Sequence, residues 1–209
     1  MQTQTFQRVK AYDGLLRIIH LVNGLAIASL ILTGSVADYF EHGAARDAIW
    51  QLHIYAGYSL IIGLAARIAW GLVGPRHARW SDMWHPRAWW TALRQRRLHL
   101  PPRVGHHVLA SAVYLLVYGV LLMMAVTGLT LAAVEQSAGP LAGWLGDAVW
   151  LKDIVKEPHE LGYDFLIGFT LIHIAMLVWH EARGGQPVAQ SMVSGYQYLP
   201  PAKKENGDV

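Results

Sequence analysis

Four long apolar stretches dominate the hydrophobic pattern along the chain. They cover approximately residues 15–34, 48–73, 106–134 and 159–180. Because a helix rises about 1.5 Å per residue, roughly 20 apolar residues cross a hydrocarbon core of about 30 Å. The pattern therefore predicts an all-α, integral membrane four-helix bundle. We expect a single four-span domain over residues 1–200 and a loose tail at 201–209.

The first apolar stretch has a second interpretation, as a cleaved signal peptide. It follows a polar arm that contains Arg8 and Lys10. The apolar part of a signal peptide is usually about 7–15 residues long, whereas this stretch is longer and contains His20. We therefore expect an uncleaved span.

The distribution of positive charge predicts the orientation of the bundle. Only 15% of the residues are charged, and the net charge of +3 is too small to indicate a nucleic-acid partner. Outside the spans, twelve Lys and Arg residues lie in the N-terminal arm, the loop after the second span and the C-terminal tail, whereas the other two loops hold three. The positive-inside rule then places both termini in the cytoplasm.

The basic loop between the second and third spans contains a short amphipathic segment. Residues 86–98 (PRAWWTALRQRRL) open with proline and mix tryptophan and leucine with arginine. This composition predicts an additional short interfacial helix that lies on membrane lipid at the cytoplasmic side. Its simplest role is an anchor, and the alternative is a lipid-sensing or docking patch.

Four histidines are placed at matched depths in the predicted spans. His20 lies in the inner half of the first span, and His53 lies at the outer end of the second. His159 opens the fourth span, and His173 follows fourteen residues later. Fourteen residues fall only about 40° short of four helical turns, so these two share one helix face about 21 Å apart. Depth then pairs His53 with His159 and His20 with His173.

Two stacked pairs of imidazoles suit two haem groups, because haem iron accepts two axial histidines. Gly24 and Gly57 follow His20 and His53 by four residues, on the same face one turn away, which leaves room for a flat porphyrin. The chain has no cysteine, which excludes iron–sulfur clusters and covalently attached c-type haem.

Other interpretations of the histidines remain. An intramembrane histidine can be a hydrogen-bonded packing residue, and zinc or copper competes for the same side chains, although two imidazoles are too few for a usual zinc site. His180, seven residues after His173, is a rival ligand.

Several short motifs carry a resemblance to a known family. They are RIIH at 17–20, HIYAGY at 53–58, RIAWGLVGPR at 67–76, ARWSD at 78–82, HEL at 159–161 and LIHIA at 171–175. With its motifs in this order, the chain resembles the bacterial di-haem cytochrome b561 family, which includes the cytochrome b subunits of nickel–iron hydrogenases. The resemblance covers about residues 9–197.

The resemblance implies two non-covalent haem b groups in a bacterial inner membrane, with axial pairs His20–His173 and His53–His159. It also implies an electron-transfer oxidoreductase subunit that connects ubiquinone or menaquinone with a periplasmic c-type cytochrome or dehydrogenase subunit. Association of two copies as a homodimer is compatible with this interpretation. The alternatives are a self-sufficient oxidoreductase that passes electrons from a small donor such as superoxide to quinone, and a haem-free transporter or scaffold.

Three further residues are candidates for contacts with the cofactors. Arg67 lies at the depth of His20, and its guanidinium can bind a haem propionate. Arg17 is a similar candidate one turn before His20. His106, at the start of the third span, is a candidate contact of quinone or propionate. The simpler roles are snorkelling of the arginines to the headgroups and a polar helix start at His106.

Overall fold

The computed structural model describes residues 7–37, 39–40, 42–95, 108–183 and 188–199. Its main elements are four long helices: α1 (Gly14–Ala37), α2 (Ala44–Val73), α4 (Val108–Gln136) and α6 (Leu151–Ala182). Each is long and apolar enough to cross a membrane. The expectation of an all-α bundle with four spans is confirmed, while residues 106–107 of the third predicted span and the predicted tail at 201–209 lie outside the described residues.

The remaining elements are short and lie at the two ends of the bundle. At one end are β1 (Gln7–Lys10), the 3-10 turns η1 (Arg76–Ala78) and η2 (Trp80–Asp82), α3 (Pro86–Gln95), α7 (Val188–Ser194) and β2 (Tyr196–Leu199); α5 (Ala142–Leu145) lies at the other. The helix expected from 86 is therefore present as α3, and residues 96–98 lie outside the described part of the chain.

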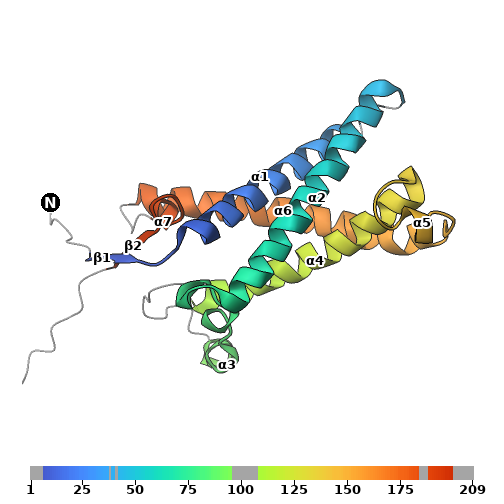
Figure 1. Ribbon diagram of the computed structural model, residues 1–209. Helices are drawn as coiled ribbons and strands as arrows, with labels where there is room; N and C mark the ends of the chain where they lie inside the picture. Colours follow the sequence, from blue (N-terminus) through green and yellow to red (C-terminus); the bar gives the residue numbers. More distant parts are fainter. Residues whose placement is uncertain (1–6, 38, 41, 96–107, 184–187, 200–209) are drawn as a thin grey trace, which may run out of the picture.

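The long helices form two hairpins, because α1 packs mainly against α2, and α4 packs mainly against α6. Figure 1 shows that the loop between α1 and α2 and the end of the bundle that carries α5 diverge from each other. The two hairpins meet through a small apolar core of six buried side chains: Ala26, Leu60, Leu64, Val117, Leu121 and Leu166. The divergent end beyond this core is where a pocket opens.

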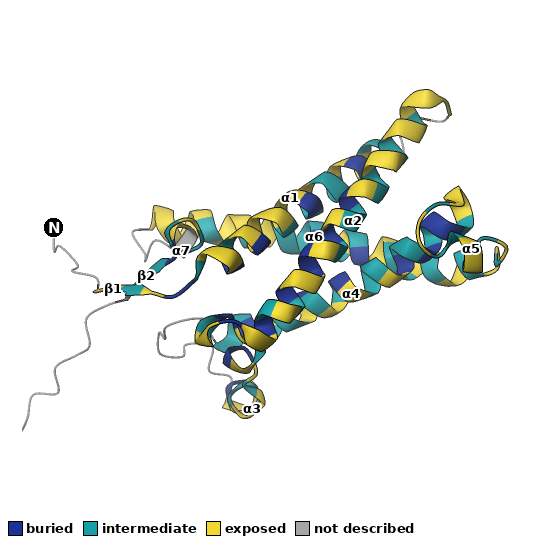
Figure 2. Ribbon diagram, viewed as in Figure 1, coloured by how far each residue is buried: buried dark blue, intermediate teal, exposed yellow. Residues whose placement is uncertain are grey.

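Large apolar side chains cover the outside of the bundle. Leu25, Leu32, Ile62, Val126 and Leu171 are each more than half exposed, and Figure 2 shows exposed residues along the outer faces of all four long helices. In water such a surface would be unfavourable, whereas lipid tails solvate it. The burial pattern therefore agrees with a membrane location.

Close helix packing in the first hairpin depends on a glycine. A Cβ atom built on Gly63 of α2 would collide with the side-chain oxygen of Asn23 of α1. This oxygen is buried without a hydrogen-bond partner among the described residues. Small residues allow such close approach in membrane helices, where packing drives association.

The two ends of the described chain are held together at the end of the bundle that carries η1, η2 and α3. β1 and β2 form an antiparallel pair, with Arg8 opposite Tyr198. The Arg17 side chain donates hydrogen bonds to the carbonyl oxygens of Met192, at 3.1 Å, and Val193. Burial raises the pKa of the nearby Tyr12 hydroxyl, so this group stays protonated at physiological pH.

Helix α6 begins earlier than the predicted fourth span. It starts at Leu151, eight residues before His159, and continues through Pro158. Proline has no backbone N–H, so the helix loses one main-chain hydrogen bond at this position but continues past it. The result is that His159 lies two turns inside a helix rather than at a helix start.

Candidate cofactor site

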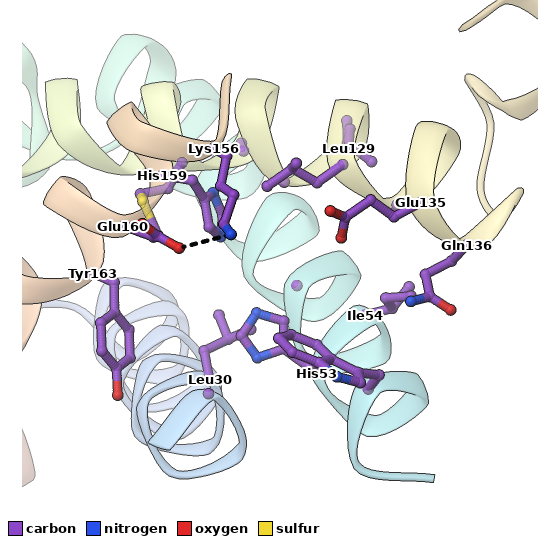
Figure 3. Close-up of a pocket in the computed structure, with 18 of the residues that line it drawn as sticks. Leu30, His53, Ile54, Leu129, Glu135, Gln136, Lys156, His159, Glu160 and Tyr163 are labelled. Carbon is purple, nitrogen blue, oxygen red and sulfur yellow. Dashed lines mark ion pairs between the residues drawn. The ribbon is translucent and has the colours of Figure 1, made fainter. Parts of the chain in front are cut away.

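A pocket of about 1000 Å³ opens between the two hairpins at the divergent end of the bundle. His53 of α2 and His159 of α6 both line it, and in Figure 3 their rings face the same space from opposite sides. The two rings are close enough that they would repel each other if both were protonated. Apolar side chains, including Leu30, Ile54 and Leu129, form much of the remaining wall.

Each of these two histidines is held by a threonine from a neighbouring helix. His53 Nδ1 lies 2.9 Å from Thr33 Oγ1 of α1. His159 Nδ1 lies 2.8 Å from Thr127 Oγ1 of α4. Because both Nδ1 atoms are engaged, Nε2 is the nitrogen left on each ring for a ligand in the pocket. This is a suitable arrangement for axial ligation of an iron between the two rings.

The residue after each threonine is a glycine that leaves room for a side chain of α6. A Cβ on Gly34 would lie 3.1 Å from the Tyr163 ring, and one on Gly128 would lie 3.2 Å from His159 Cε1. Tyr163 also forms a 2.5 Å hydrogen bond with Ser35 Oγ. The Thr-Gly pairs of α1 and α4 therefore fix how closely α6 approaches the pocket.

The inner pair is brought together as well. His20 of α1 and His173 of α6 are close enough that their rings would repel each other if both were protonated. His173 stacks on Phe169, with ring centroids 5.6 Å apart. His20 is exposed and His173 is half-buried, and within the described ranges no hydrogen bond is made by either ring.

The two glycines expected to make room for porphyrins face open space. A Cβ atom built on Gly24 or on Gly57 would meet nothing within 4 Å, and Gly57 lines the pocket beside His53. The described residues contain no group of three or more His, Cys, Asp or Glu that could hold a bare metal ion. Paired imidazoles with open space beside them fit a haem, which brings four of its six iron ligands itself.

The predicted propionate partners differ in their surroundings. Arg67 is 2% exposed and lies over the Trp80 ring at 4.5 Å. Its Nε donates to the Tyr118 hydroxyl at 3.1 Å, whereas Nη1 has no hydrogen-bond partner among the described residues. A buried guanidinium with an unused donor suits an anionic group.

The structure gives less support to the other residues that were predicted to contact a cofactor. Two donors of Arg17 are used on the main chain of α7, so a propionate contact there stays a prediction. His106 lies outside the described residues. His180 is exposed near the end of α6.

Charged side chains surround the mouth of the pocket. Lys152 pairs with Glu135 at 2.8 Å, and Lys156 pairs with Glu160 at 3.6 Å. All four line the pocket, and Figure 3 shows the Lys156–Glu160 pair beside His159. The polar mouth and apolar wall together resemble a site for an amphipathic cofactor with acidic groups at one edge.

Thr33 and Thr127 are the site residues that the sequence analysis missed. Each belongs to a Thr-Gly dipeptide, in ILTGS at 31–35 and AVTGL at 125–129. The dipeptide recurs once in each hairpin, ahead of the histidine that it contacts. That repetition was the available signal, but a threonine in an apolar helix is also an ordinary packing residue, which bonds its own main chain.

Comparison with known proteins adds independent information. Residues 11–195 match the sequence profile of the prokaryotic cytochrome b561 family. The chain is 28% identical to a "Probable Ni/Fe-hydrogenase B-type cytochrome subunit" of Azotobacter vinelandii, covering 90% of this chain and 88% of the relative. Proteins of the same name from Rhizobium leguminosarum bv. viciae and Rhodobacter capsulatus are each 29% identical over 90% of this chain and 88% and 81% of theirs, respectively.

Proposed function

Because this chain belongs to the prokaryotic cytochrome b561 family, we propose that it carries electrons between membrane quinone and a periplasmic redox partner through two haem b groups. Family membership makes the chain a membrane-bound b-type cytochrome of electron transfer. We propose the remaining features: the number of haems, their ligands, the use of quinone and the redox partner.

The observation that carries the proposal is the pocket between His53 and His159. In the outer site these two histidines would hold one haem through their Nε2 atoms, since each Nδ1 is engaged by a threonine. In the inner site His20 and His173 would hold the second. A bound haem supplies reversible exchange of single electrons at its iron.

The geometry of α6 supports transfer across the membrane. His159 and His173 both belong to this one continuous helix, so the helix rise separates them by about 21 Å on nearly the same face. Haems held by these two histidines would have a gap between their edges that is much shorter than this separation. Reduction of a quinone to quinol takes two electrons and two protons, so two single-electron transfers are needed for each quinone.

We propose that both termini and α3 are cytoplasmic and that the pocket opens toward the periplasm. Support comes from the excess of Lys and Arg in the N-terminal arm, the loop after α2 and the C-terminal tail. α3 fits a helix on the membrane surface, because Trp90 and Leu93 are more than half exposed while Trp89 Nε1 bonds Val108 O at 2.7 Å. Enzyme fusions test this: alkaline phosphatase should be active after residue 143 and inactive at the C-terminus.

The redox partner would dock at the mouth of the outer pocket. The relatives are named as subunits of nickel–iron hydrogenase, so a hydrogenase is one candidate for the periplasmic partner, beside a c-type cytochrome or another dehydrogenase. The exposed Trp144 and Trp150 and the Lys152 and Lys156 side chains lie at this end. Cross-linking from the loop between α4 and α6 should capture a redox protein.

Quinone would bind within reach of one of the two haems. His106 and Arg67 are the proposed contacts at the inner side, where the Nη1 donor of Arg67 has no partner among the described residues. The same donor could instead hold a haem propionate, and both candidate ligands present a carbonyl or carboxylate oxygen.

The test is the haem content and the reactivity of the purified chain. A pyridine haemochrome assay should give two b haems per chain, reducible by a quinol analogue in detergent. Absence of a Soret band would contradict the proposal and favour a haem-free transporter or scaffold. Sustained reduction of quinone by superoxide, without any partner protein, would instead favour a self-sufficient oxidoreductase.

A further inference from the structure

The outer histidines share a contact that the inner histidines lack within the part of the chain that the structure describes. In each hairpin a threonine of the first long helix holds the histidine of the second: Thr33 of α1 contacts His53 of α2, and Thr127 of α4 contacts His159 of α6. Both threonines are buried, at 5% and 7% exposure. The same threonine–histidine contact thus occurs twice around one pocket, and the four side chains come from four different helices.

The hydrogen bonds of the threonines decide which atom carries the proton. A hydroxyl has only one proton to donate. Thr33 donates it to the carbonyl of Ser29 at 2.7 Å, and Thr127 donates it to the carbonyl of Met123 at 2.9 Å. With that proton directed to the main chain, each hydroxyl oxygen is left to accept from the histidine, which favours the form of His53 and His159 with the proton on Nδ1.

A second acceptor supports this assignment for His53. The Leu30 carbonyl oxygen lies 3.2 Å from the same Thr33 hydroxyl that contacts this ring, so a second main-chain acceptor is available to the hydroxyl proton. A carbonyl oxygen can only accept. With the proton on Nδ1, the neutral ring has its lone pair on Nε2, which is the form that binds iron.

We propose that Thr33 and Thr127 are positioning residues that fix the Nδ1–H tautomer of His53 and His159 and aim both Nε2 atoms at the iron of the outer haem. This inference rests on the proposed function, since it assumes that the two histidines are axial ligands. It adds that the outer site is prearranged by the protein, whereas the inner ligands have no such partner within the described residues and gain only the stacking of Phe169 on His173.

The test replaces each threonine by valine in the holoprotein. Thr33→Val and Thr127→Val keep the branched shape of the side chain but remove the hydroxyl oxygen that accepts from the histidine Nδ1. Partners of this kind typically contribute 10–100-fold to metal affinity and raise the basicity of the imidazole. We expect one of the two haems to transfer to excess apomyoglobin about tenfold faster than in the wild type. Its midpoint potential should also move in the positive direction, because a less basic ligand stabilises the oxidised iron less.

Two controls separate this role from general packing. Thr33→Ser and Thr127→Ser retain the hydroxyl and should restore the wild-type potential. Thr130→Val is the matched control, because Thr130 is also buried in α4 and also donates to the carbonyl four residues back, at 2.9 Å, but contacts no histidine among the described residues. It should leave both potentials unchanged.

The inference is overturned if both valine variants keep two haems with wild-type potentials and transfer rates. It is equally overturned if Thr130→Val gives the same shift, or if the valine variants disturb both haems, because the effect is then not confined to the outer site. Failure of the proposed function looks different: the wild type would lack two b haems, or His53→Ala and His159→Ala would retain both.

Discussion

Gly128 of α4 lies directly against the ring of His159 of α6: a Cβ atom at this glycine would be 3.2 Å from His159 Cε1. The position of the His159 ring, a proposed axial ligand, is therefore set by the absence of a side chain on a different helix. The neighbouring Thr127 holds the Nδ1 atom of the same ring. Together these two residues determine both how far the ring reaches and how it is rotated.

A side chain at position 128 should disturb the outer haem in proportion to its size. Gly128→Ala requires a shift of a few tenths of an ångström and should retain both haems, with an altered spectrum for one. Gly128→Leu should leave a folded protein with only the inner haem. Haem-to-protein ratios of the purified variants measure this, and two normal haems in Gly128→Leu would contradict the ligand assignment.

Gly57 provides a different kind of test, because it faces open pocket rather than a side chain. A Cβ there meets nothing within 4 Å, and alanine is favoured over glycine in a helix by about 1 kcal/mol. Gly57→Ala should therefore fold normally and bind both haems, whereas Gly57→Phe should fill the space of the outer porphyrin. The assay is the Soret absorbance per chain, and unchanged absorbance in Gly57→Phe would place the porphyrin elsewhere.

The contact between Gly63 and Asn23 should control the stability of the first hairpin. Gly63→Ala introduces a collision with the Asn23 side chain, and overpacking of this kind costs about 1–3 kcal/mol. Thermal unfolding in detergent should therefore occur at a lower temperature. Adding Asn23→Ala removes the obstacle and should recover most of the loss. A double variant as unstable as the single one would show that the collision is not the cause.

Arg67 should influence one haem through its charge. A cation near an iron favours the reduced state, which carries one positive charge fewer. Arg67→Gln should therefore move one midpoint potential in the negative direction, and Tyr118→Phe, which removes only the partner of Nε, should have a smaller effect. Arg87→Gln on the exposed part of α3 is the control. Unchanged potentials in Arg67→Gln would argue against a role near either haem.

The sequence was sufficient for the features that depend on helical periodicity. Long apolar runs predicted the four helices, since a membrane leaves few other structures for them. The spacing of His159 and His173 predicted that they share a face of one helix, and the structure brings His53 near His159 and His20 near His173. Their ligand roles remain predictions.

Contacts between residues that are far apart in the sequence could not be predicted from helical periodicity. The pairing of β1 with β2 joins residues 7–10 with 196–199, and neither segment has a strong strand signal by itself. The start of α6 at Leu151 was missed because residues 151–158 (LKDIVKEP) contain four charged side chains and do not continue the apolar stretch. Thr33 and Thr127 were missed because their role depends on a ring that lies 20 and 32 positions later in the sequence.

The pairing of the four histidines is tested most directly by redox titration of the single variants His20→Ala, His53→Ala, His159→Ala and His173→Ala. His53→Ala and His159→Ala should lose or perturb the same haem, and His20→Ala and His173→Ala should lose or perturb the other. Four wild-type titrations, or a different grouping of the variants, would contradict this pairing.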